Sequence, residues 1–373
     1  MSNLFESAKI GSMVLRNRFV RSATWEAMAT KDGAVTPRLV DLIADLAKGG
    51  VGLVISGHAY VRPEGQAGPA QLGAYKDALI PGLRQMAAAA HDHGAKILLQ
   101  LAHAGYFAPQ TLTGRPAFAV SASVQLDDIP RKEMSNADIH NLVLAFAEAA
   151  LRAEAAGFDG VQIHAAHGYL LNQFLSPLFN RRKDEYGGSL RNRARVHREI
   201  ITAMRQALGN DFPILVKING RDFAQGGLEL EDSLQAATLM ERAGLDAVEL
   251  SSGMTKHSTF GSARTGISSQ AKEAYNQEEA KAFKRRLKTP LILVGGIRSL
   301  PVAERLVKDG ACDFISMSRP FIREPDLVNR WKSGDRRKAA CTSDNLCFGP
   351  ARSGEGLYCV TAAKKRKSVA KKG

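Results

Sequence analysis

The chain lacks several features that define whole classes of protein. Its 373 residues contain no uncharged apolar run of about 18 residues, the length that a membrane-spanning helix requires. Cysteine is scarce, with four residues in the chain, which excludes a disulfide-built scaffold of the secreted kind. The N-terminus has no charged-then-apolar signal pattern, so we expect a cytoplasmic protein with no membrane partner.

Disorder over the whole length is also excluded. Hydrophobic residues make up 45% and charged residues 24%, close to the average of globular chains. The 51 basic and 37 acidic residues give a net charge of +14. Much of this excess lies at the end of the chain, in Lys364, Lys365, Arg366, Lys367, Lys371 and Lys372. We expect residues 361–373 to form a basic disordered tail; a tether to nucleic acid or membrane is the alternative, and we do not expect nucleic acid as a partner.

The order of expected elements predicts the fold class. Short aliphatic or β-branched runs alternate with amphipathic helical runs, of which 37–48 and 136–156 are examples, with Ser135 and Ser299 as expected N-caps. The expected strands cover 17–24, 51–61, 96–104, 157–166, 212–220, 247–253, 290–297 and 312–319. This α/β alternation predicts a (β/α)8 TIM barrel, with a doubly wound sheet as the alternative.

The remaining segments predict the domain organisation. We expect residues 1–16 to form a short N-terminal lid over the barrel floor, within a barrel domain of residues 1–334. Residues 335–360 are expected to be a C-terminal extension, followed by the tail 361–373.

Glycine and arginine at the seventh and eighth strand ends predict a phosphate site. The chemistry of such barrels lies at the carboxyl ends of the strands. Gly295 and Gly296 allow an anion close to the backbone, and a helix begins near Ser299 with its N–H groups expected to be free. Ser318 and Arg319 add a hydroxyl group and a cation.

Other strand ends carry further candidate chemistry. His164, His167 and Tyr169 follow the fourth strand and could polarise a carbonyl group and deliver a proton; buried structural hydrogen bonds or a metal pair are the alternatives. Lys217 ends the fifth strand, where it could form a Schiff base or stabilise an anionic cofactor ring. Gln100 ends the third strand and could bind both edges of an amide-like ring.

Over roughly residues 4 to 330 the sequence resembles the old yellow enzyme family of FMN-dependent NAD(P)H:flavin oxidoreductases. The most specific motif is the continuous run His164-Ala-Ala-His167-Gly-Tyr169-Leu-Leu-Asn-Gln-Phe-Leu-Ser-Pro177. It is followed by Asn180-Arg-Arg-Lys-Asp184-Glu-Tyr186-Gly-Gly-Ser189.

The resemblance implies an ene-reductase with tightly bound, non-covalent FMN. Such an enzyme passes hydride from NADH or NADPH to the β-carbon of an electron-poor alkene such as an α,β-unsaturated carbonyl compound. By position, His164 and His167 hold the substrate oxygen and Tyr169 protonates the α-carbon. The implied cofactor residues are Ala23, Thr24, Trp25, Gly57, Gln100, Lys217, Gly295, Gly296, Ser318 and Arg319. The implied substrate pocket contains Trp25, His58 and Tyr60, and a homodimer or homotetramer is expected.

Two departures from the family pattern change these expectations. Trp25 stands where relatives carry threonine or cysteine, so the hydrogen bond to the flavin is lost or replaced by an N–H group, and we expect a different reduction potential. Cys341, Cys347 and Cys359, with Asp344 in the second position, resemble a degenerate iron–sulfur motif. We expect no metal there, with Zn²⁺ or an iron–sulfur cluster as alternatives.

Two alternatives to the ene-reductase remain open. One is a phosphate-binding barrel lyase or isomerase that uses Lys217 as a Schiff-base nucleophile. The other is a flavoprotein without ene-reductase activity.

Overall fold

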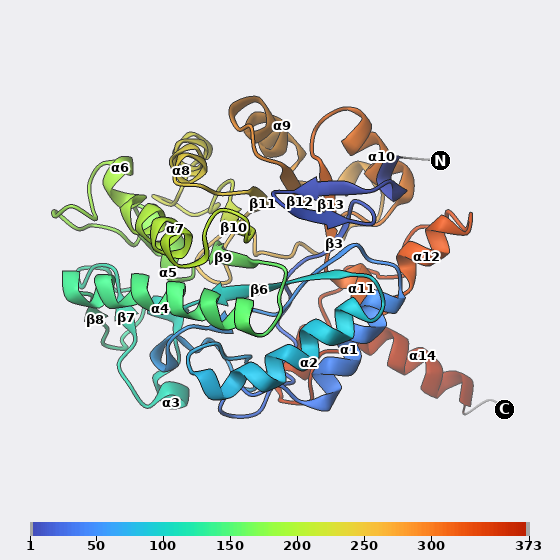
Figure 1. The fold of residues 1–373 in the computed structure, drawn as a ribbon, viewed down its shortest axis with the longest axis horizontal. Helices are drawn as coiled ribbons and strands as arrows, with labels where there is room; N and C mark the ends of the chain where they lie inside the picture. Colours follow the sequence, from blue (N-terminus) through green and yellow to red (C-terminus); the bar gives the residue numbers. More distant parts are fainter. Residues whose placement is uncertain (1–2, 371–373) are drawn as a thin grey trace.

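Eight short parallel strands close into a barrel in the computed structural model, which describes residues 3–370 (Figure 1). The barrel strands are β3 (Phe19–Arg21), β4 (Leu53–Ile55), β6 (Lys96–Ala102), β9 (Val161–Ala165), β10 (Ile214–Asn219), β11 (Ala247–Ser251), β12 (Leu291–Val294) and β13 (Phe314–Met317). Strand β13 pairs with β3, and β4 pairs with β6, so the sheet has no open side. The predicted (β/α)8 TIM barrel is confirmed.

One predicted strand is divided. The expected strand 51–61 is β4 followed by β5 (Ala59–Tyr60), with a break at Ser56–His58. The break arises because the backbone N–H of Gly57 donates to the carboxylate of Glu26 at 3.0 Å and not to a neighbouring strand. Polar side-chain partners from other segments are invisible to a periodicity argument, so the strand was predicted as continuous.

Helices surround the barrel, and their faces toward the strands are apolar. The main helices are α1 (Pro37–Lys48), α2 (Ile80–His91), α4 (Asn136–Ala155), α7 (Arg195–Leu208), α8 (Leu230–Arg242), α9 (Gln277–Arg286) and α10 (Leu300–Lys308). Shorter helices lie in the connections and near the C-terminus: α3 (Gln110–Thr113), α5 (Leu170–Leu175), α6 (Leu190–Arg193), α11 (Arg319–Arg323), α12 (Leu327–Lys332) and α13 (Phe348–Arg352). A further short strand pair, β7 (Phe118–Ala119) and β8 (Lys132–Glu133), lies in the loop after β6.

The two predicted N-caps have different outcomes. Ser135 caps α4 in a reciprocal capping box with Asp138, as expected. Ser299 precedes α10 but makes no side-chain cap; its hydroxyl donates to Glu273 at 2.6 Å. The expected cap is therefore wrong, because a carboxylate from a distant loop has taken over that role.

The N-terminal hairpin closes the floor of the barrel. Strands β1 (Ala8–Ile10) and β2 (Met13–Leu15) pair antiparallel. Their buried side chains Ile10, Met13 and Leu15 belong to one apolar cluster with inward-facing residues of the barrel strands, which are Val20, Leu53, Ile55, Leu98, Leu215, Ala247, Ile292 and Phe314. The predicted lid over the floor is confirmed.

The C-terminal extension folds back on the barrel. The N–H of Leu357 donates to the carbonyl oxygen of Glu26 at 2.8 Å, and Arg319 donates to the side chain of Asn345 at 2.7 Å. Beyond it, Val360–Ala370 forms helix α14, which points away from the barrel (Figure 1). The predicted disorder is thus wrong over residues 361–370, because alanine, lysine and arginine favour helix and no glycine or proline interrupts them. Residues 371–373 lie outside the described part of the chain.

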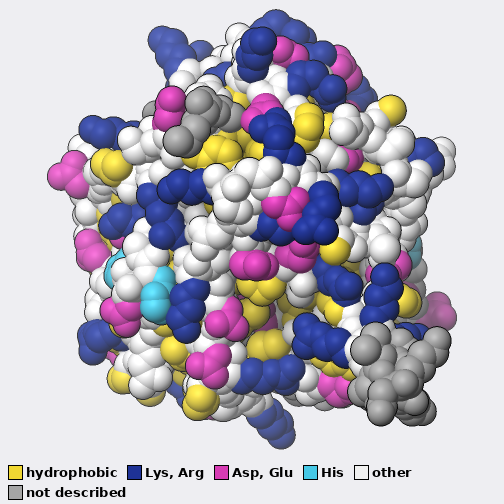
Figure 2. Space-filling view, turned by 90° about the vertical axis from the view of Figure 1, so that its right-hand side faces the viewer, with side chains coloured by type: hydrophobic (Ala, Val, Ile, Leu, Met, Phe, Trp, Pro, Cys, Tyr) yellow, Lys and Arg dark blue, Asp and Glu magenta, His cyan; other side chains and the backbone are white. Residues whose placement is uncertain are grey.

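Basic side chains are spread over one face of the molecule. Figure 2 shows Lys and Arg across this whole face with acidic side chains between them, and no single basic stripe. Within residues 3–370, no helix is both long and apolar enough to cross a bilayer.

We predict that the lid contributes strongly to stability. Leu15 is fully buried in the floor cluster, so Leu15→Ala should lower the free energy of unfolding by about 2–5 kcal/mol. Val14, which is 49% exposed, is the matched control, and Val14→Ala should cost less than about 1 kcal/mol. Urea denaturation measures both changes. Equal losses would show that the hairpin does not seal the floor.

Candidate active site

Three predicted catalytic side chains lie together at the barrel mouth, with a fourth beside them. The ring of His164 is 5.2 Å from that of His167 and 5.0 Å from that of Tyr169, measured between centroids. His58, from the loop after β4, stacks on His164 at 6.2 Å and lies edge-on to Tyr169 at 5.5 Å. His164 is buried, whereas His58, His167 and Tyr169 remain partly exposed. The cluster therefore has one side that is open to a substrate.

A strained turn directs His167 into this cluster. Its backbone φ is +62°, a left-handed conformation that costs free energy for a residue with a side chain. The side chain of Asn219 accepts its N–H at 3.2 Å, and Ser251 hydrogen-bonds its Nε2 at 2.8 Å. Asn172 holds the next residue by accepting the N–H of Gly168 at 2.7 Å. These contacts position the imidazole.

Burial keeps the cluster neutral. It lowers the pKa values of His164 and His167 well below the usual range, and nearby cationic or imidazole groups lower them further. Burial also raises the pKa of Tyr169 to about 12. The two imidazoles are thus uncharged N–H donors, and the phenol holds its proton at neutral pH.

A buried ion pair lies in the barrel beneath the cluster. Lys217 Nζ is 3.3 Å from Glu249 Oε1, and both side chains are almost fully buried. Lys217 Nζ also donates to Ser22 at 2.7 Å. Glu249 further accepts hydrogen bonds at 2.7–2.9 Å from Ser22, Ser316 and Gln162. This network joins four strands and the residue after β3.

The surroundings favour the charged form of Glu249. Burial alone would raise its pKa, but Lys217 and the three hydrogen bonds together hold the pKa below its ordinary value. Burial lowers the pKa of Lys217, and Glu249 opposes that change. The pair places a positive ammonium group at the centre of the barrel.

Sequence reasoning missed Glu249. A signal was present, because a lone carboxylate in the apolar run Ala247-Val-Glu249-Leu is unusual. It stands in register with Lys217 on β10, which in turn pairs with His164 on β9. Gln162 is the second missed residue; it accepts a hydrogen bond from Gln100 at 2.7 Å. The NH₂ group of the Gln100 amide is therefore already hydrogen-bonded inside the barrel.

Glu26 is a third missed residue and explains Gly57. Its carboxylate pairs with Arg21 at 2.7 Å in a buried contact. A Cβ atom on Gly57 would lie 1.9 Å from the Glu26 carboxylate and 2.8 Å from the carbonyl oxygen of Thr24. Only glycine therefore fits at position 57.

The expected phosphate residues follow the paired strands β12 and β13, with one correction. Thr24 and Ser318 hydrogen-bond at 2.7 Å, and Gly296 has a left-handed φ of +71° close to Tyr275. The N–H groups of Arg298 and Ser299, however, donate to the carboxylate of Glu273 at 2.7 and 2.9 Å. The prediction of free N–H groups at the start of α10 is wrong, because Glu273 satisfies them.

Arg319 is part of the same region. Its guanidinium donates to the carbonyl oxygen of Arg264 at 2.8 Å and to Asn345 at 2.7 Å. These contacts hold the side chain between the loop after β11 and the C-terminal extension. The glycine pair, Ser318 and Arg319 thus remain the candidate phosphate residues.

Of the remaining predicted residues, some follow the first barrel strand and one lies apart from the histidine cluster. Ala23 and Trp25 are partly exposed after β3, and the Trp25 ring packs on Gly68, where a Cβ atom would lie 2.7 Å from it. The Trp25 Nε1 is buried and has no partner within the described chain. Tyr60 makes no ring contact with the histidine cluster in the described chain; its ring stacks on that of Tyr75 at 5.1 Å.

The cysteine region has its own contacts. Cys341 and Cys347 are buried and Cys359 is half-buried, all as free thiols. The Asp344 carboxylate accepts hydrogen bonds from Thr342 and Thr361 at 2.7 and 2.6 Å. Among residues 3–370, no three or more His, Cys, Asp or Glu side chains are arranged to hold a metal ion. Asp344 here fastens the start of α14.

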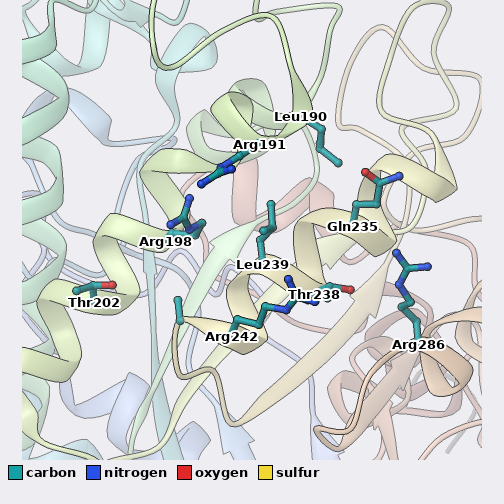
Figure 3. A pocket seen from close by; sticks show the side chains of 10 residues that line it. Leu190, Arg191, Arg198, Thr202, Gln235, Thr238, Leu239, Arg242 and Arg286 are labelled. Carbon is teal, nitrogen blue, oxygen red and sulfur yellow. The ribbon is translucent and has the colours of Figure 1, made fainter.

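A groove of about 650 Å³ lies elsewhere, on the outer face of the barrel between α6, α7, α8 and α9. Figure 3 shows its arginine side chains around Leu239. They are Arg191, Arg198, Arg242 and Arg286. No Asp, Glu, His, Cys or Tyr lines this groove, so the candidate active site is the barrel mouth.

Neutral donors and a buried ammonium group at the mouth of a closed barrel are what the sequence resemblance implies for a flavin-dependent oxidoreductase. The family model described as NADH:flavin oxidoreductase / NADH oxidase matches residues 3–338. The chain belongs to this family and resembles the old yellow enzymes within it. Its cofactors are FMN and NAD(P)H.

Similar proteins include both long and short relatives. A protein named NADH oxidase from Thermoanaerobacter brockii is 34% identical over 93% of this chain. The chain spans about half of that relative, 54% of its length. A solved 2-naphthoyl-CoA reductase structure has a TM-score of 0.90 at 28% identity, covering 96% of this chain and 56% of that one. An old yellow enzyme homologue from Zymomonas mobilis has a TM-score of 0.77 at 27% identity, covering 91% and 96%.

The residues at the mouth fit FMN. Lys217 supplies a buried cation in the barrel. The hydroxyl group of Tyr169 is a donor that is not enclosed and has no partner in the described chain.

We predict strong coupling between Lys217 and Glu249. Glu249→Gln leaves a buried ammonium group without a counter-charge, and Lys217→Met does the same to the carboxylate. Each should lower the free energy of unfolding by about 3–5 kcal/mol. The double variant should lose clearly less than the sum, as measured by denaturant unfolding.

Acid denaturation provides the control. The folded-state pKa of Glu249 is lowered, so its contribution to stability is present above its ordinary pKa and is lost as the pH falls through the folded value. Glu249→Gln should remove that part of the pH dependence. If the two single losses in free energy of unfolding were additive, and Glu249→Gln left the pH dependence of stability unchanged, the pair would not be ionised.

Proposed function

We propose that the protein is an ene-reductase: it takes hydride from NADH or NADPH and delivers it to the β-carbon of an electron-poor alkene. The observation that supports this best is the neutral His164–His167–Tyr169 cluster, open on one side and placed above the Lys217 ammonium group. FMN supplies the hydride chemistry when it is bound.

In this proposal His164 and His167 bind the activating carbonyl oxygen of the substrate. Both rings are neutral N–H donors. Their hydrogen bonds would stabilise the negative charge that develops on that oxygen. Ser251 fixes the ring of His167 through its Nε2. The carbonyl group is thereby polarised and the alkene carbon becomes a better hydride acceptor.

Tyr169 delivers the proton to the α-carbon. Its hydroxyl group has no hydrogen-bond partner within the described chain and is not enclosed, so it is free to face a substrate. A pKa of about 12 keeps the proton in place until a carbanion-like carbon accepts it.

Lys217, Gln100, Trp25, Gly57, Ala23 and Thr24 would line the FMN ring, and Gly295, Gly296, Ser318 and Arg319 would hold its phosphate. The ammonium group of Lys217 would stabilise negative charge on the ring. The Schiff-base alternative requires a free amine on Lys217. Its Nζ is instead paired with Glu249 and hydrogen-bonded to Ser22, which disfavours that alternative.

The visible absorption spectrum and two half-reactions test the proposal. The purified protein should show the absorption of oxidised flavin and release FMN on denaturation. In Tyr169→Phe, reduction by NAD(P)H should be unchanged, while alkene reduction should slow by about 10²–10⁴-fold because the proton donor is lost. Stopped-flow absorbance separates the two steps. Equal slowing of both would remove Tyr169 from this role.

A further inference from the structure

His58 lies beside the catalytic cluster but has no role in the function proposed above. It follows β4 and contacts two residues of the catalytic cluster, with ring centroids 5.5 Å from Tyr169 and 6.2 Å from His164. Burial lowers its pKa to about 4, so the ring is neutral at pH 7 and carries a single proton. Which nitrogen holds that proton decides what the ring can bind.

The side chain of Gln71 determines the position of this proton. The Gln71 Oε1 accepts the backbone N–H of Ala67 at 2.6 Å. Its NH₂ group therefore faces His58, where it donates to the carbonyl oxygen at 3.0 Å and to Nδ1 at 2.6 Å. An amide NH₂ group has no lone pair to offer, so Nδ1 must be the acceptor. The proton of His58 is consequently on Nε2.

This Nε2–H group is available for a ligand. It has no partner within residues 3–370 and is not among the buried polar atoms that lack one, so it is open to solvent. His103 provides the contrast. Its Nδ1 accepts the N–H of Gly105 at 3.0 Å, which also places the proton on Nε2, but that Nε2 is enclosed in the protein. Of these two fixed rings, only His58 opens at the barrel mouth.

We infer that His58 is a third hydrogen-bond donor to the substrate, beside His164 and His167, and that Gln71 is a positioning residue that holds it in the Nε2–H form. The inference rests on the proposed function and specifies its substrate class. Three donors exceed what one carbonyl oxygen needs. The site therefore favours alkenes that carry a second acceptor oxygen in addition to the activating carbonyl group.

Two alkenes of nearly equal size test this preference on the FMN-loaded full chain. Cyclohex-2-en-1-one has one carbonyl group and cyclohex-2-ene-1,4-dione has two. The readout is the ratio of their kcat/KM values, which cancels effects common to both substrates. In His58→Phe the dione-to-enone ratio should fall about five- to tenfold, the worth of one neutral hydrogen bond.

Gln71→Glu is the second variant and preserves the His58 ring. A carboxylate can only accept, so it draws the proton to Nδ1 and turns Nε2 into an acceptor. The ratio should then fall as in His58→Phe. His140→Phe makes the same substitution at an exposed position on α4 and should keep the ratio of the unmodified protein.

Imidazole ¹⁵N NMR at pH 7 gives a readout that does not depend on turnover. The His58 proton should be on Nε2 in the unmodified protein and on Nδ1 in Gln71→Glu. A proton on Nδ1 in the unmodified protein, or an unchanged ratio in His58→Phe, would overturn the inference. A flavin-loaded protein that reduces neither alkene would instead overturn the proposed function and, with it, the substrate role of His58.

Discussion

The ion pair between Lys217 and Glu249 is the contact on which the site depends. Two charges removed from water cost several kcal/mol each, and the mutual attraction offsets this only when every remaining donor and acceptor is satisfied. Ser22, Ser316 and Gln162 provide that satisfaction from three further positions around the barrel. The pair thus ties the strand ends together, and it fixes a cation one layer below the catalytic cluster.

The barrel interior is consequently divided into two parts with opposite chemistry. The lower part is apolar and sealed by the N-terminal hairpin. The upper part is polar, first with the charged pair and then with neutral imidazole and phenol groups at the mouth. The charged Lys217–Glu249 pair is thus separate from the neutral groups that donate hydrogen bonds or a proton at the mouth.

Much of this could be predicted from sequence because it depends on local pattern. The alternation of strands and helices gave the barrel, and the strand-end rule brought His164, His167, Lys217 and Arg319 to the same end. The failures share a different cause. Glu273 at the start of α10, Glu26 against Gly57 and Gln71 behind His58 are contacts between segments far apart in the chain. No periodicity records such contacts, whereas the register of neighbouring strands would have revealed Glu249.

Closure of the barrel has a consequence for how the chain folds. Strand β3 completes the sheet by pairing with β13, which joins residues 19–21 to residues 315–317. The hairpin at residues 8–15 packs on strands that extend as far as Phe314. One edge of β3 pairs with β4, which follows closely in the chain, but its other edge finds β13 only after nearly the whole barrel has been made. Such long-range closure slows folding and leaves one edge of β3 unpaired until β13 is made, and an unpaired strand edge is prone to aggregation.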